Sequence, residues 1–148
     1  MKLKVLISFL LLGVLFTNCN TKNLEKKPID DFIGLWEIQG REMLDGIQIK
    51  IEKTDNNKLK GRVIKLNDNK YVKMFVEVDD IWVTGIKRSS NFQFVLTEKK
   101  IASDIFGLYD LGTTKDFNVQ FINDQGIGLE AGSKDPTKSK IRYKRIAE

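Results

Sequence analysis

The sequence predicts an all-β domain, an antiparallel up-and-down β-barrel of about eight to ten strands. Apolar and polar residues alternate with a period of two in short runs from about residue 33 to residue 146. Clusters of turn-forming residues separate these runs. Proline is absent from Ile29 through Asp135, as central strands require because proline removes a donor from the hydrogen-bond ladder. The 148 residues suffice for one domain with its own core.

Five alternating runs define the predicted strands most clearly. In chain order, the residues that share one face of each run are Ile47, Ile49 and Ile51; Leu59, Gly61 and Val63; Phe92, Phe94 and Leu96; Phe117, Val119 and Phe121; and Ile141, Tyr143 and Arg145. We expect the isoleucines of the first run and the phenylalanines of the third and fourth to face the core, since a slip of one residue would turn each set outward. The pattern does not decide whether a short helical turn forms around residues 98–103.

The two ends of the predicted domain favour a closed barrel over an open two-sheet sandwich, which the alternation would also fit. Gly34 and Trp36 form G-x-W at the start of the first strand, and Arg145 lies in the last strand. This arrangement resembles the lipocalin and wider calycin pattern. The resemblance implies that Trp36 is buried at one closed end, with the Arg145 guanidinium against its ring. The first and last strands would then be neighbours, which leaves no exposed sheet edge.

A second resemblance is carried by two internal stretches. Residues 59–64 read LKGRVI and follow the first strand by one hairpin, and residues 106–110 read FGLYD. The pattern is similar to a bacterial family of small exported barrels with no assigned function. That resemblance implies a fold and no activity.

The N-terminus has the pattern of an export signal. Residues 1–4 form a short segment with two lysines. Residues 5–16 are almost wholly apolar, but they are too few to cross a hydrocarbon core of about 30 Å, so they fit the apolar region of a signal peptide. The chain's one cysteine, Cys19, ends the stretch LFTNC. This stretch resembles the lipobox of bacterial lipoproteins, which implies that Cys19 is lipidated and becomes the mature N-terminus. The alternative is an ordinary secretory signal with an incidental cysteine.

These observations divide the chain into three parts. We expect a lipoprotein signal peptide at residues 1–18, the lipidated cysteine and a flexible polar tether at residues 19–31, and the barrel domain at residues 32–148. The protein would be exported and membrane-anchored in the bacterial cell envelope, at the outer membrane or on the periplasmic face. Its membrane contact would be the N-terminal lipid. A net charge of +5 is too mild to indicate nucleic acid.

Composition excludes much catalytic chemistry. The chain has no histidine, so Ser-His and Cys-His nucleophilic pairs and histidine-ligated metals are excluded. Asp104, Asp110 and Asp116 are interpreted as turn residues rather than as an acid–base or calcium set. The basic residues from 134 to 145 are interpreted as a solvated face rather than as a contact for anionic headgroups. We therefore expect no enzyme, no catalytic residue, no metal and no cofactor.

Two hypotheses for function remain. The first is a lipid-anchored envelope binding protein whose lipocalin-like barrel holds a small apolar or amphipathic ligand. The residues expected to line its cavity are Trp82, Phe92, Phe94, Tyr109 and Phe121. The alternative is a protein–protein module of the envelope, such as an inhibitor, immunity protein or assembly factor, with a filled barrel.

Overall fold

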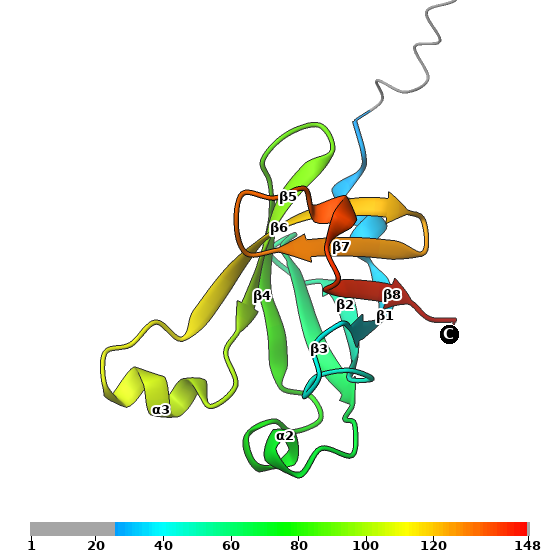
Figure 1. The fold of residues 1–148 in the computed structure, drawn as a ribbon. Helices are drawn as coiled ribbons and strands as arrows, with labels where there is room; N and C mark the ends of the chain where they lie inside the picture. Colours follow the sequence, from blue (N-terminus) through cyan, green and yellow to red (C-terminus); the bar gives the residue numbers. More distant parts are fainter. Residues whose placement is uncertain (1–25, 148) are drawn as a thin grey trace, which may run out of the picture.

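A computed structural model describes residues 26–147, in which eight strands form one closed antiparallel barrel (Figure 1). Each strand pairs with the next in the chain, and the last pairs with the first. The strands are β1 (Gly34–Gln39), β2 (Gln48–Lys53), β3 (Leu59–Lys65), β4 (Ile81–Arg88), β5 (Gln93–Lys99), β6 (Thr114–Asn123), β7 (Gly126–Glu130) and β8 (Arg142–Arg145). The chain is thus an all-β, lipocalin-like up-and-down barrel, as the sequence predicts.

The first and last strands close the barrel. In the antiparallel register of β1 and β8, Trp36 lies opposite Arg145 and Ile38 lies opposite Tyr143. Closure is therefore confirmed, and the open sandwich is excluded. Because every strand has two neighbours, the barrel has no free sheet edge.

The alternation predicts the buried face well, with one exception. Ile47, Ile49, Ile51, Phe94 and Phe117 are buried, and Phe121 packs half-buried against the core.

The prediction for Phe92 is wrong, because its side chain is 39% exposed. Residues 89–92 form the turn between β4 and β5, so Phe92 precedes the strand that turns Phe94 inward.

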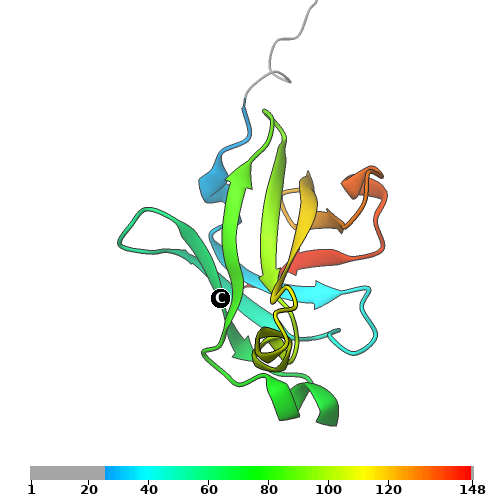
Figure 2. The ribbon, with the colours of Figure 1, turned by 90° about the vertical axis from the view of Figure 1, so that its left-hand side faces the viewer.

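Two short helices that the alternation does not predict lie at one end of the barrel (Figures 1 and 2). Helix α2 (Lys70–Phe75) begins at Asn69, whose side chain accepts hydrogen bonds from the backbone N–H groups of Tyr71 and Val72. Helix α3 (Ser103–Leu108) follows β5 and leads into β6. Residues 98 and 99, where the sequence pattern does not decide between a strand and a helical turn, belong to β5.

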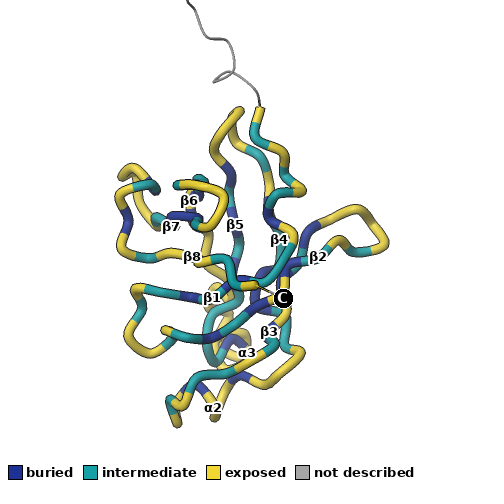
Figure 3. Tube along the Cα trace, turned by 90° about the vertical axis from the view of Figure 1, so that its right-hand side faces the viewer, coloured by how far each residue is buried: buried dark blue, intermediate teal, exposed yellow. Residues whose placement is uncertain are grey.

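Two 3₁₀ turns complete the described chain. Turn η3 (Ile29–Phe32) lies at the end of the barrel opposite the two helices, and η4 (Pro136–Lys138) connects β7 to β8 (Figure 2). Figure 3 shows much of the exposed backbone in the loops and around the two helices. Cys19 and the signal segment lie outside the described residues. Within residues 26–147, no helix is both long and apolar enough to cross a bilayer.

Candidate functional site

The end of the barrel that carries η3 is closed by Trp36 and Arg145. Trp36 is fully buried, and its indole N–H donates to the carbonyl of Phe32 at 2.7 Å. The Arg145 guanidinium carbon lies 4.2 Å from the centroid of the Trp36 ring. This contact confirms the placement predicted for the pair. It is a cation–π contact across the strands that close the barrel.

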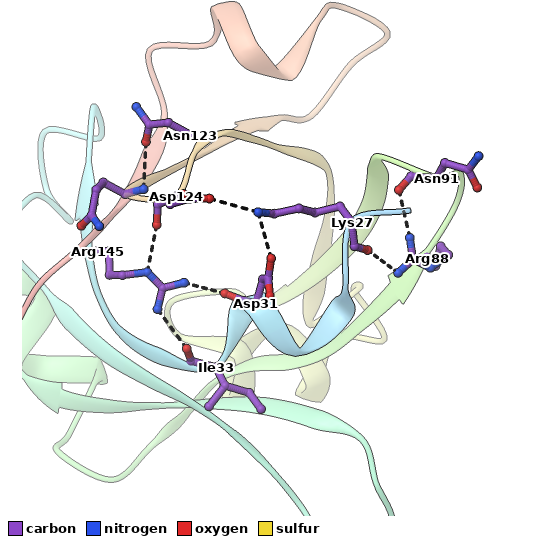
Figure 4. A network of polar contacts seen from close by, with 9 residues as sticks. Lys27, Asp31, Ile33, Arg88, Asn91, Asn123, Asp124 and Arg145 are labelled. Carbon is purple, nitrogen blue, oxygen red and sulfur yellow. Dashed lines mark hydrogen bonds and ion pairs between the residues drawn. The ribbon is translucent and has the colours of Figure 1, made fainter. Parts of the chain in front are cut away.

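Arg145 also ties three segments of the closed end together (Figure 4). Its guanidinium donates to the carbonyls of Asp124, Ile33 and Asp31 at 3.0, 3.0 and 2.5 Å. Gly34 permits this approach, because a Cβ atom at that position would lie 2.6 Å from Arg145 Nη1. Its φ of +135° is likewise a conformation that side chains disfavour. Gly34 and Trp36, the two fixed positions of the G-x-W motif, thus both allow Arg145 to pack at the closed end.

The start of the described chain is fastened to the same end (Figure 4). The Lys27 N–H donates to the carbonyl of Asn91 at 3.0 Å, and the Lys27 carbonyl accepts from Arg88 at 2.6 Å. The Lys27 ammonium pairs with Asp31 at 2.8 Å and with Asp124 at 3.1 Å. The hydrogen bond that the Lys27 ammonium donates to Asp31 is the main reason why the pKa of Lys27 is raised. The described chain therefore enters the barrel at its closed end.

Aromatic rings fill the interior of the barrel next to its closed end. The Phe32 ring lies 4.9 Å from Phe94 and 4.7 Å from Phe121, measured between centroids. Two of the residues expected to line a cavity, Phe94 and Phe121, thus pack against η3. Phe92 lies in the exposed turn nearby.

A buried polar cluster occupies the opposite half of the barrel. Glu98 is only 3% exposed, and the Arg41 guanidinium donates to its two carboxylate oxygens at 2.6 and 3.1 Å. The Tyr143 hydroxyl also donates to Glu98. The Arg41 guanidinium carbon lies 4.6 Å from the centroid of the Phe117 ring. The buried Glu98 carboxylate thus accepts hydrogen bonds from both Arg41 and Tyr143, and a buried carboxylate requires such partners.

Burial determines the protonation state of Tyr143. Its side chain is fully buried, and burial, reinforced by the negative charge of Glu98, raises the pKa of the phenol well above its usual 10.0. Tyr143 is therefore a neutral donor across the physiological range.

Trp82 is the unsatisfied member of this region. It is 3% exposed, and its indole nitrogen makes no hydrogen bond to any residue in the described range. Contact of its N–H with the Tyr143 oxygen opposes the rise in the pKa of Tyr143 and is the smallest of the causes, so the N–H lies near the phenol without a hydrogen bond of normal geometry. A buried donor without an acceptor costs about 1–3 kcal/mol. Such a group is a candidate partner for a ligand or an ordered water.

Two adjacent pockets meet at Trp82. The larger, of about 450 Å³, lies between α2 and α3. The smaller, of about 250 Å³, lies over Arg41 and Glu98. They share Trp82, Lys99 and Lys100. We call this region, with α2, α3 and both pockets, the open end of the barrel.

The structure brings one of the five predicted lining residues, Trp82, to both pockets. Tyr109 lies just beyond α3 and is 74% exposed. Sequence reasoning missed Arg41, Glu98 and Tyr143 as a polar cluster. Glu98 carried a usable signal, because it continues the inward period of Phe94 and Leu96, where an acid must find a partner.

The three aspartates occupy separate structural roles. Asp110 has a φ of +53° in the turn after α3. Asp116 accepts a hydrogen bond from Thr97 across β5 and β6 at 2.7 Å, and exposed Asp104 lies 3.6 Å from Lys99. Within residues 26–147, no group of three or more acidic, histidine or cysteine side chains is placed to hold a metal ion.

Comparisons of the chain with models of known protein families, with curated proteins and with solved structures find no match. The class of protein therefore rests on the fold and the site alone. It is a small closed β-barrel in which aromatic rings fill the interior near one end and two adjacent pockets lie at the other.

Proposed function

We propose that this protein is a lipid-anchored binding protein of the bacterial cell envelope, with a calycin-type barrel that holds a small amphipathic ligand at its open end. The observation that carries the proposal is Trp82, which lines both pockets and whose buried N–H has no acceptor. A ligand oxygen near this N–H would supply the missing hydrogen bond. Protein pockets for small molecules combine apolar walls with a few such polar groups.

The mouth of the pockets supports an apolar component in the ligand. Exposed apolar side chains gather on the two helices and the turn after α3: Met74, Phe75, Ile105, Leu108 and Tyr109. Leu108 is 83% exposed and Met74 is 69% exposed. Exposed apolar groups gathered around a pocket are typical of a binding site.

The anchoring part of the proposal rests on Cys19 and on the place where the chain enters the barrel. Lys27 follows Cys19 by eight residues and is fastened to the closed end. A fully extended chain of that length spans roughly 26–29 Å. The closed end would therefore face the membrane that holds the lipid, and the open end would face away from it.

Native mass spectrometry of the protein extracted from its own membrane tests the binding function. We expect a small amphipathic molecule to remain bound and to be released on denaturation. Trp82→Phe, which removes the N–H, should reduce the bound fraction several-fold. Phe92→Ala, which changes an exposed aromatic residue outside the open end, is the matched control and should leave it unchanged. Protein without any bound small molecule in all three samples would contradict the proposal.

The exposed apolar helices favour one second candidate, a protein–protein module that presents the open end to an envelope partner. In that case a folded protein would cover Met74 and Leu108. Photo-crosslinking from residue 108 in cells separates the two candidates. A discrete crosslinked protein, together with the absence of a co-purified small molecule, would favour the module.

A further inference from the structure

We propose that the ligand is an anionic amphiphile whose charged group lies in the smaller pocket of the open end. This inference rests on the proposed function and specifies the class of ligand. It follows from the different charge of the two pockets.

The smaller pocket is strongly cationic. Arg41, Lys99, Lys100 and Lys115 line it, and Glu98 is its one acidic lining residue. Glu98 is already held by both arms of the Arg41 guanidinium. The lining therefore has an excess of positive charge, which favours an anion and disfavours a cationic ligand.

Two of these lysines have charge available for a ligand. The ammonium groups of Lys100 and Lys115 lie over aromatic rings, 5.6 Å from the centroid of Phe106 and 5.0 Å from that of Phe117. Neither forms an ion pair with an acidic side chain in residues 26–147. Lys99 has only a 3.6 Å contact to exposed Asp104, and an exposed pair of this kind contributes little. A carboxylate, sulfate or phosphate group would pair with these ammonium groups.

Trp82, which lines the same pocket, has a neutral donor close to it. Its N–H lacks an acceptor, and each of the three anionic groups has several acceptor oxygens. A purely apolar ligand would leave this N–H unpaired and would desolvate the lysines without compensation. The charged side chains of this pocket therefore argue against a hydrocarbon without a head group.

The larger pocket differs from the smaller one in the balance of its charges. Its apolar lining includes Met74, Phe75, Val76, Ile81 and Ile105. Its charged lining residues are of both signs, with Glu77, Asp80 and Asp104 beside Lys99 and Lys100. It therefore lacks the positive excess of the smaller pocket. Because the two pockets share Trp82, one molecule could extend from one to the other.

The test compares two probes of equal chain length, decanoate and decanol, by calorimetry. The full chain, purified from its membrane, is placed in phosphatidylcholine nanodiscs, and empty nanodiscs provide the blank for partitioning. We expect decanoate to bind at least tenfold more tightly than decanol. Its advantage should shrink as the salt concentration rises, because salt screens charges near the surface.

A pair of matched double variants assigns the effect to the smaller pocket. Lys100→Gln with Lys115→Gln should reduce the preference for decanoate to less than threefold and leave decanol binding unchanged. Lys134→Gln with Lys144→Gln removes the same charge from exposed positions outside both pockets and should preserve the preference. Circular dichroism confirms that each variant folds.

The outcomes separate the two proposals. Equal binding of decanoate and decanol, or a preference unaffected by the Lys100 and Lys115 changes, would overturn the anionic head group and leave the binding function intact. Binding of neither probe by the folded protein would count against both.

Discussion

The two ends of the barrel use similar residues for different purposes. Each has an arginine over an aromatic ring and a buried tryptophan. At the closed end, the Trp36 N–H and the Arg145 guanidinium are paired with backbone carbonyls. At the open end, the Trp82 N–H has no partner within the described chain. The comparison teaches that the buried donors of the closed end are all used by the fold, whereas the unpaired donor marks the end where we propose that a ligand binds.

The largest effect concerns the orientation of the two ends. Cys19→Ser should move the protein from the membrane fraction to the soluble fraction or leave its signal uncleaved, because the lipid would have no attachment point. Fractionation and N-terminal mass measurement check this. Unchanged processing and membrane retention would contradict lipidation at Cys19 and, with it, the orientation of the closed end toward the membrane.

The closed end should account for the largest loss of stability from a single side chain. Trp36→Ala should reduce the free energy of unfolding by roughly 3–5 kcal/mol, because it removes a fully buried ring and leaves a cavity. Urea denaturation measures this effect. Arg145→Ala should cost less, and the double variant should lose less than the sum of the two single losses, since the two residues share one contact. Additive losses would contradict the coupling between the two residues.

The polar cluster of the open end should respond to the loss of one charge. Glu98→Gln leaves the Arg41 guanidinium without its carboxylate, so we expect a loss of about 1–3 kcal/mol in urea denaturation. Glu130→Gln, an acid-to-amide change in β7, provides the control and should have a small effect. Equal costs for the two variants would show that the Arg41–Glu98 pair does not stabilise the fold.

Alkaline pH should weaken the same cluster through Tyr143. Its pKa is raised in the folded state, so its contribution to stability is present below the unfolded pKa of about 10 and is lost as the pH rises through the folded value. The slope is at most about 1.4 kcal/mol per pH unit for one proton. Unfolding measured between pH 9 and 11 (roughly the range around that pKa) should show a smaller decline in Tyr143→Phe than in the unaltered protein. Identical declines would contradict this role for the phenol.

The smallest effect distinguishes the two tryptophans directly. Trp82→Phe should change stability by less than about 1 kcal/mol, because it also removes an unpaired N–H. Trp36→Phe should cost more, since it leaves the Phe32 carbonyl without its donor. A greater loss in Trp82→Phe would mean that the Trp82 N–H has a structural partner.

The sequence predicts the fold more fully than the site for a physical reason. Alternation reports which side chains face the core, so Ile49, Phe94 and Phe117 are found from the pattern. Trp36 and Arg145 are found because the resemblance pairs the first strand with the last. Helix α2 has only six residues and no repeated apolar period, and its start depends on one capping side chain, Asn69. The site combines Arg41, from a loop, with Glu98 and Trp82 from two strands, a proximity that appears only when the barrel closes.

The most direct test of a ligand site at the open end observes both indole N–H groups at once. In a ¹⁵N–¹H spectrum of the full chain in nanodiscs, the Trp82 and Trp36 indole signals report the open and closed ends separately. Titration with decanoate, or with decanol if the head group is not needed, should shift the Trp82 signal and leave the Trp36 signal in place, because Trp36 already donates to Phe32. If neither probe moves the Trp82 signal, or if only the Trp36 signal moves, the open end is not the binding site.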